Sequence, residues 1–314
     1  MSAKKASRKK TSSHKNASSK KILALPSTLS LLKATVQQLK YSRKLFAGIA
    51  LTYALLLVLF TGALISGYDV ATSKQLLQEL AGSQGAQASN LTSSLTLFGG
   101  LFAGTGDDSQ AAGVYQSIIV LMSSLAFVWA YRQTYGQINE SGAHKNTAPK
   151  LKVRDAFYAG MYPLVPALFV LCMIGIGLLP VVLASGIYGT MISAGLAVGV
   201  IEQSLWAFGI GALIAFSLYL LTSWSLAFYV VSLPNVYPRD AIKAARRYVS
   251  GRRMKVLSKM FLLAILLLSF IVVVVLPAIL FVPAIAELLF FVTTIGCFVI
   301  MHGFMYNLYR ALLK

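Results

Sequence analysis

Residues 257–280 read LSKMFLLAILLLSFIVVVVLPAIL, and after FVPA the chain continues over 285–309 with IAELLFFVTTIGCFVIMHGFMYNLY. Each run is long enough to cross a hydrocarbon core of about 30 Å as a helix that rises about 1.5 Å per residue. A backbone that spans lipid has to satisfy its own hydrogen bonds, so runs of this length and apolarity form helices rather than barrel strands. The pair therefore predicts a tight hairpin of two transmembrane helices that turns at Pro283.

Four more apolar segments of spanning length precede this hairpin. The chain has 314 residues, of which 57% are hydrophobic and 12% are charged, whereas a soluble domain carries about 25% charged residues. This composition excludes soluble enzymes, disordered proteins, fibres and disulfide scaffolds for the chain as a whole. The predicted fold class is an all-α, polytopic helical membrane protein. Its six transmembrane helices are expected at 45–66, 111–131, 160–184, 205–231, 257–280 and 285–309.

The Lys and Arg residues fall in alternate connections between these spans. Twelve precede the first span, five lie in 132–159 and seven lie in 232–256, whereas 67–110 holds one and 185–204 holds none. Connections rich in Lys and Arg stay on the cytoplasmic side of a membrane. The pattern predicts that both termini are cytoplasmic (N-in/C-in) in the cytoplasmic membrane of a bacterium. The net charge of +19 is then mostly the cytoplasmic charge of a multi-pass protein.

The N-terminal region differs from the rest of the chain. Residues 1–21 combine Lys and Arg with Ser, Ala, Thr and Asn, and such a stretch repels itself and has no apolar face to bury. We expect it to be a disordered basic cytoplasmic tail. Residues 22–44 carry spaced Leu and Val, which predicts an interfacial amphipathic segment with a short helix that starts near Ser27 or Thr28. Residues 45–314 form the predicted six-helix transmembrane domain.

The connection between the fourth and fifth spans holds the most informative polar sequence. Pro238 can open a helix, because its missing N–H would be unpaired there in any case. Asp240 complements the positive end of the helix dipole, and Gly251 can end the helix in a left-handed cap. A short amphipathic helix over 238–250 is therefore expected along the cytoplasmic surface. Its candidate lipid- or partner-binding residues are Arg239, Lys243, Arg246, Arg247, Arg252, Arg253 and Lys255.

Three interpretations of this basic helix stay open. The simpler one is attraction to anionic membrane lipid together with control of topology, at about 1 kcal/mol per basic residue near the surface. The sharper one is docking of a cytoplasmic protein partner or a lipid head group. A third possibility is that 238–250 is the coupling element of a transporter or permease subunit. However, Gly251 stands too far from Asp240 for the EAA-x3-G spacing of permeases.

The same segment carries a resemblance to known families. Residues 231–255 resemble the pattern shared by YciC-like proteins and the membrane domain of glycerophosphodiester phosphodiesterases, and the resemblance implies no catalytic residues. The whole chain is similar to uncharacterised six-span bacterial integral membrane proteins, with a Lys- and Arg-rich start, a long first external loop and an LPxxYP turn at 233–238. The residues that match the local pattern are Pro238, Ala241, Ile242, Ala245, Gly251, Arg252 and Arg253.

Motifs for catalysis or cofactor binding are absent from the sequence. It has no GxxxxGK[ST], HExxH, GxSxG or paired CxxC motif, so we expect no enzyme activity, no cofactor and no metal site. A lone histidine, His302, is interpreted as hydrogen-bonded packing in the sixth span. The basic tail could contact nucleic acid phosphates, but it has no aromatic residue before Tyr41 for stacking on bases. The sequence thus favours a non-enzymatic membrane scaffold or accessory factor.

Overall fold

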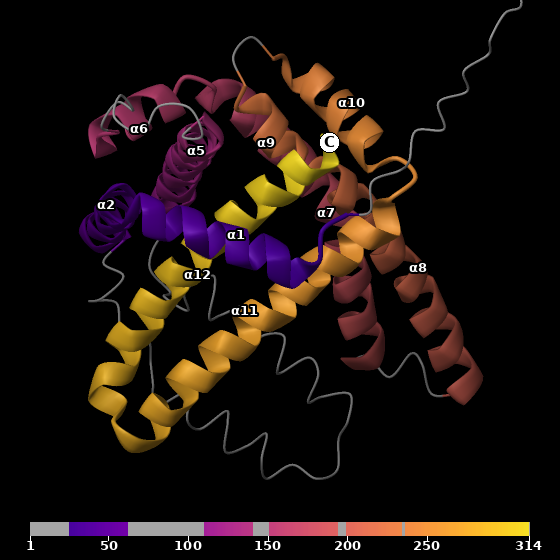
Figure 1. Ribbon diagram of the computed structural model, residues 1–314. Helices are drawn as coiled ribbons and strands as arrows, with labels where there is room; N and C mark the ends of the chain where they lie inside the picture. Colours follow the sequence, from indigo (N-terminus) through magenta and orange to yellow (C-terminus); the bar gives the residue numbers. More distant parts are fainter. Residues whose placement is uncertain (1–24, 62–109, 141–150, 194–198, 234–235, 314) are drawn as a thin grey trace, which may run out of the picture.

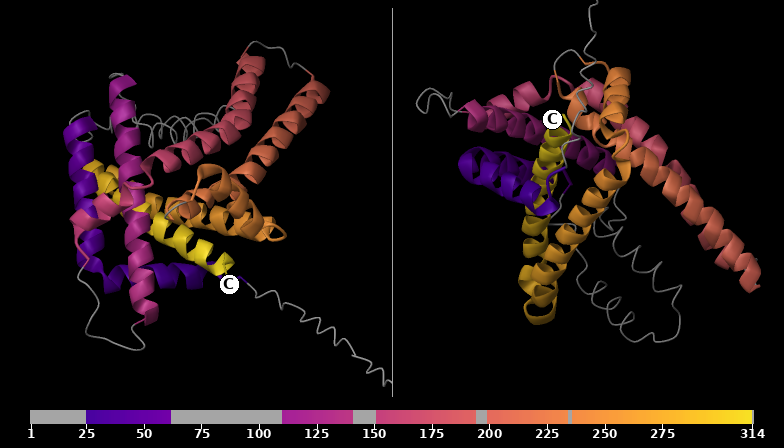
Figure 2. Two further views of the ribbon diagram at one scale, coloured as in Figure 1. Left: turned by 90° about the horizontal axis from the view of Figure 1, so that it is seen from above. Right: turned by 45° about the vertical axis from the view of Figure 1, so that its right-hand side comes forward.

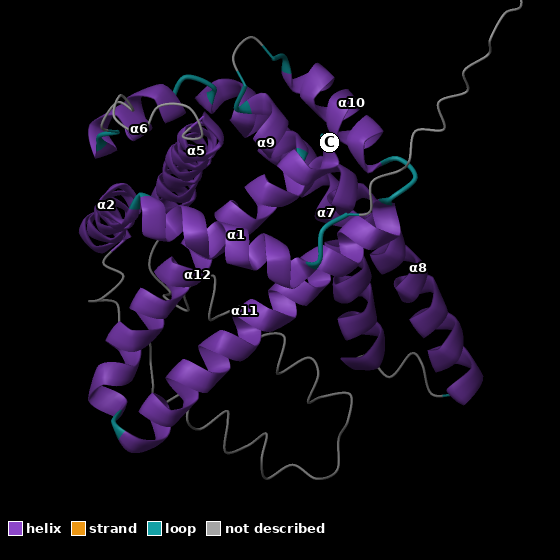
Figure 3. Ribbon diagram, in the orientation of Figure 1, coloured by secondary structure: helices purple, strands orange, loops and turns teal. Residues whose placement is uncertain are grey.

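The structure of the chain is a computed structural model (Figure 1). It describes residues 25–61, 110–140, 151–193, 199–233 and 236–313, and helix is the only regular secondary structure in these ranges (Figure 3). The predicted tail over 1–21 lies outside the described residues. In chain order the helices are α1 (Thr28–Tyr41), α2 (Arg43–Thr61), α5 (Gln110–Glu140), α6 (Val153–Gly160), α7 (Leu164–Ser193), α8 (Val200–Trp224), α9 (Ala227–Val231), α10 (Pro238–Val249), α11 (Arg253–Phe281) and α12 (Pro283–Leu312).

Six helical segments are long and apolar enough to cross a membrane, and they confirm the predicted all-α, six-span fold class. The fourth span contains the predicted range 205–231, and within it the helix is interrupted at Ser225 and Leu226, between α8 and α9. The side of the membrane on which the chain ends lie stays a prediction. The spans run over Arg43–Phe60, Val114–Gln137, Leu164–Ala184, Ile201–Val231, Arg253–Phe281 and Ile285–Leu312.

The spanning helices pack as pairs that meet at one end. α11 and α12 form the predicted hairpin, α7 packs along α8, and α2 packs along α5. The α7–α8 pair and the α11–α12 pair approach each other near α10 and diverge away from it (Figure 2). We call the end that carries α1, α6 and α10 the basic end. The described Lys and Arg residues belong to α1, the start of α2, the second half of α5, the segment from Lys152 to Arg154, α10, the 252–259 region and the end of α12.

The side chains that are buried most deeply also gather toward the basic end. Tyr131 and Phe127 of α5 and Phe304 and Leu308 of α12 are fully buried in one cluster, together with Leu226 at the bend after α8. Near their other ends, α8 and α11 expose large apolar side chains, as expected for surfaces that face lipid tails. Close packing therefore fixes the relative positions of the helices where the candidate site lies.

Helix α1 crosses α12 at very short range, and a glycine makes this possible. A Cβ atom on Gly303 of α12 would lie 2.6 Å from the Tyr131 hydroxyl oxygen and would also overlap the side chain of Thr35 on α1. Because Gly303 has no side chain, the Tyr131 hydroxyl fits beside it and donates a hydrogen bond to the Val299 carbonyl oxygen at 3.0 Å. Gly303 therefore lets α1, α5 and α12 meet at one point.

Candidate functional site

The predicted helix between the fourth and fifth spans is present as α10, and its local signals behave as expected. Pro238 occupies the first turn, Asp240 lies in that turn, and Gly251 has a φ of 76° just after the helix ends. This left-handed conformation favours glycine, because a Cβ atom would crowd the following carbonyl. The turn at Gly251 sends the chain directly into α11.

Small residues hold α10 against the ends of the spanning helices. Ala241, Ala245 and Val249 are completely buried, and α10 packs on α9, α8 and α7. These residues recur at a spacing of four, so they form one face of the helix. Because two of them are alanines, the backbone of α10 can approach its neighbours closely.

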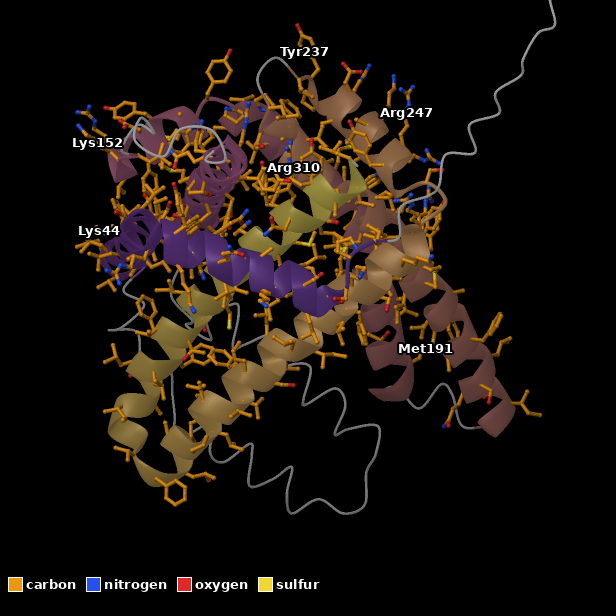
Figure 4. All side chains as sticks on the ribbon, viewed as in Figure 1. Lys44, Lys152, Met191, Tyr237, Arg247 and Arg310 are labelled. Atoms are coloured by element: carbon orange, nitrogen blue, oxygen red, sulfur yellow. The ribbon has the colours of Figure 1, made fainter. Side chains whose placement is uncertain are left out.

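Four cations occupy the opposite face of α10. Arg239, Lys243, Arg246 and Arg247 are all exposed, and their spacings of three and four residues place them on one side of the helix. In Figure 4 the labelled side chain of Arg247 lies at the outer margin of the basic end and points away from the spanning helices. We call these four residues the α10 cationic face.

The remaining three predicted residues lie apart from the α10 cationic face. Lys255 is exposed and Arg252 is half-buried at the start of α11. Arg253 turns toward the bundle, and its guanidinium carbon lies 4.2 Å from the centre of the Tyr219 ring on α8. The seven predicted residues therefore form two groups, one on α10 and one at the junction of α8 and α11.

None of these seven cations has a carboxylate partner among the described residues. Within the described ranges, the only ion pair joins the neighbours Arg154 and Asp155 at 3.9 Å, and both side chains are exposed. Exposed pairs of this kind contribute little, at about 0–1 kcal/mol. Among the described residues, the positive charge of the basic end is thus not neutralised by ion pairs.

A lysine on α11 holds the residues just before α1 beside the start of α11. The Lys259 ammonium donates a hydrogen bond to the Pro26 carbonyl oxygen at 2.6 Å. Ser27 follows as the N-cap of α1, where its hydroxyl oxygen accepts a bond from the Ser30 N–H at 3.3 Å. Pro26 therefore lies beside the basic start of α11. No local sequence pattern indicates this contact.

A row of four tyrosine rings and one arginine, which we call the tyrosine row, connects α10 to the core. The ring of Tyr248 on α10 lies 6.2 Å from that of Tyr309 on α12 in an edge-on arrangement. Tyr306 stands between Tyr309 and Tyr135 of α5, with centroid separations of 6.3 and 6.1 Å, and Arg310 caps the Tyr135 ring at 4.5 Å. Edge-on aromatic pairs of this kind add about 0.5–1.5 kcal/mol each. The contacts of the tyrosine row fix the orientation of α10 relative to α12 and α5.

His302 lies in an aromatic surrounding on α12. Its Nδ1 atom is 3.1 Å from the Tyr229 hydroxyl, and its ring packs edge-on against Phe298 at 4.6 Å. The rings of Phe127 and Phe228 complete the surrounding. These contacts confirm hydrogen-bonded packing for His302. Its Nε2 atom is buried and has no partner among the described residues.

Comparison with known proteins adds no relative. No protein-family model matches the chain, and neither a curated protein nor a solved structure matches it. The resemblance of residues 231–255 to YciC-like proteins and to the phosphodiesterase membrane domain therefore stays a prediction.

Proposed function

We propose that the protein is a non-enzymatic scaffold or accessory factor of a bacterial cytoplasmic membrane, which engages negatively charged partners at its basic end. The observation that carries this proposal is the α10 cationic face. It holds four exposed cations without carboxylate partners, on a helix that Ala241, Ala245 and Val249 fix in place. Because the backbone of α10 is already held in place, binding at this face costs only the ordering of its side chains.

The position of each basic group favours a different partner. The α10 cationic face points away from the spanning helices at Arg247 (Figure 4), so an acidic surface of a cytoplasmic protein is the ligand that it suits. The group at the start of α11 lies beside α8, which is itself a spanning helix. Anionic lipid can reach this second group from the membrane. The protein would thus hold lipid and a cytoplasmic partner at one end of its helices.

The proposal can be tested with two matched quadruple variants. The first replaces Arg239, Lys243, Arg246 and Arg247 with Gln. The control removes the same charge from four exposed residues of α1 and α2, by replacing Lys33, Lys40, Arg43 and Lys44 with Gln. Each protein is purified from membranes in mild detergent, and every co-purifying protein and lipid is quantified against the unaltered chain.

The α10 variant is expected to lose at least one specific protein that the control variant retains, and both are expected to insert normally into the membrane. The same set of proteins and lipids with both variants and with the unaltered chain would contradict the proposal. Equal losses from the two variants would also contradict it, because they would show that net charge alone governs binding.

The transporter or permease alternative is less well supported. Gly251 stands too far from Asp240 for the EAA-x3-G spacing of permeases. Co-purification of an ATPase that is lost with the α10 variant would favour the alternative over the scaffold.

A further inference from the structure

The contact between Arg253 and Tyr219 differs from the rest of the basic surface. The guanidinium of Arg253 lies over the Tyr219 ring, with its carbon 4.2 Å from the ring centre. Its Nη1 atom is buried without a hydrogen-bond acceptor, and no other described residue accepts a bond from this side chain. Stacking orients the plane of the guanidinium, and the half-buried side chain has N–H donors without an acceptor that an oxyanion can satisfy.

Further cations lie at the start of α11, and none of them pairs with an acid among the described residues. Arg252 and Lys255 stand beside Arg253 in the sequence, and Lys259 lies within two turns on α11. Among the described residues, none of these cations pairs with a carboxylate. Lys259 binds the Pro26 carbonyl oxygen, which holds the start of α1 close to this group. The start of α11 therefore carries an excess of positive charge, which attracts an anionic group.

Exposed apolar side chains continue from the contact toward the middle of the two spans. Tyr219 is 46% exposed, and Phe216, one turn further along α8, is 52% exposed. On α11, Phe261 is 66% exposed and follows Arg253 by eight residues, a spacing that keeps the two side chains on roughly the same face. A cationic group above an apolar surface matches a phosphate joined to hydrocarbon chains.

We propose that the junction of α8 and α11 binds one anionic diacyl glycerophospholipid. The lipid phosphate accepts hydrogen bonds from the guanidinium of Arg253 that Tyr219 orients, while its acyl chains lie along Phe216 and Phe261. This inference gives a defined site to the lipid engagement in the proposed function, and it does not depend on the α10 cationic face. Basic groups between spanning helices on the cytoplasmic side are known to hold lipid head groups.

The test uses the purified full-length protein in detergent. Native mass spectrometry measures the binding of phosphatidylglycerol during a titration, with phosphatidylcholine of the same chain length as a zwitterionic comparison. The variant Arg253→Gln is compared with the matched control Arg43→Gln at the exposed start of α2. Loss of one charge-assisted phosphate contact is expected to weaken phosphatidylglycerol binding by about tenfold in Arg253→Gln and to leave Arg43→Gln unchanged.

Two further variants keep the test decisive if Arg253→Gln does not elute as a single species. Arg253→Lys keeps the charge but loses the stacked plane, so it is expected to bind phosphatidylglycerol with intermediate affinity. Tyr219→Leu keeps an apolar side chain but no longer orients the guanidinium, and it is expected to weaken binding as well. Inorganic phosphate at millimolar concentration is expected not to displace the lipid, because it lacks acyl chains.

Three results would overturn the inference. Equal weakening in Arg253→Gln and Arg43→Gln would show unspecific charge attraction. Equal binding of phosphatidylcholine would remove the preference for an anionic lipid, and displacement by inorganic phosphate would indicate a site for a free anion. Failure of this inference is distinguishable from failure of the proposed function, because protein partners are expected to depend on the α10 cationic face and not on Arg253.

Discussion

The side chains of Gln38 and Asn307, which stand 269 positions apart in the sequence, form a reciprocal pair of hydrogen bonds. Gln38 Nε2 donates to Asn307 Oδ1 at 3.2 Å, and Asn307 Nδ2 donates to Gln38 Oε1 at 3.1 Å. Asn307 Nδ2 also donates to the Thr35 hydroxyl oxygen at 3.0 Å. All three side chains are buried between α1 and α12. This pairing holds the first described helix against the last one at the basic end.

Replacement of Asn307 by Leu is expected to destabilise the protein. The substitution leaves the buried amide of Gln38 without partners, at a cost of about 1–3 kcal/mol. The double variant Gln38→Leu with Asn307→Leu is expected to recover much of that loss, because no polar group then stays unpaired. Thermal unfolding of the purified proteins in one detergent measures both effects. A double variant as unstable as the sum of the two single variants would contradict this role for the pair.

Gly303→Ala is expected to separate α1 from α12. The new methyl group would lie 2.6 Å from the Tyr131 hydroxyl oxygen, so the melting temperature should fall. The matched control is Gly296→Ala on the same helix, where a Cβ atom meets nothing within 4 Å. This control should be neutral or slightly stabilising, since Ala costs about 0.5–1 kcal/mol less than Gly within a helix. Equal melting temperatures for the two variants would refute the close approach at Gly303.

Gly251→Val is expected to disturb the turn between α10 and α11. The φ of 76° at this position costs an L-residue with a side chain about 1–2 kcal/mol, and a β-branched residue is the least suited to it. Gly251→Asn is the control, because Asn tolerates this conformation better. The account predicts a lower melting temperature for the Val variant than for the Asn variant. The reverse order would show that the turn does not need a left-handed residue.

Binding at the α10 cationic face is expected to be sensitive to salt. Screening shortens the reach of exposed charges to about 3 Å at 1 M ionic strength, compared with about 10 Å at 0.1 M. Raising the salt concentration during purification should therefore release the proteins that the α10 variant fails to bind. Their quantity at several salt concentrations is the measurement. Retention of those proteins at high salt would indicate an apolar interface elsewhere on the chain.

The sequence predicts the features of this fold that depend on local signals. Apolar runs locate the six spans, and Pro238, Asp240 and Gly251 locate α10 because each acts on the backbone beside it. The bend at Ser225 and Leu226 is not predicted, since both neighbouring segments are equally apolar. Hydropathy over a window of residues cannot detect such a short interruption.

The contacts that assemble the candidate site could not be predicted in this way. Lys259 and Pro26 lie 233 positions apart, and the interaction of Arg253 with Tyr219 depends on how α8 and α11 pack. In the sequence, Arg253 is one of several similar cations, and only tertiary packing separates it from the others. The same holds for Gly303, whose neighbours in the sequence give no sign that another helix approaches it.

The central claim is that the basic end of the helices faces the cytoplasm, and labelling of single cysteines tests it most directly. Cys172 and Cys297 are first replaced with Ala, and then Arg247→Cys or Val282→Cys is introduced at two exposed positions, on α10 and at the turn between α11 and α12. A thiol reagent that does not cross membranes is applied to intact cells and to permeabilised cells. The account predicts that the cysteine at 282 reacts in intact cells, whereas the cysteine at 247 reacts only after permeabilisation. Labelling at 247 in intact cells would contradict the account.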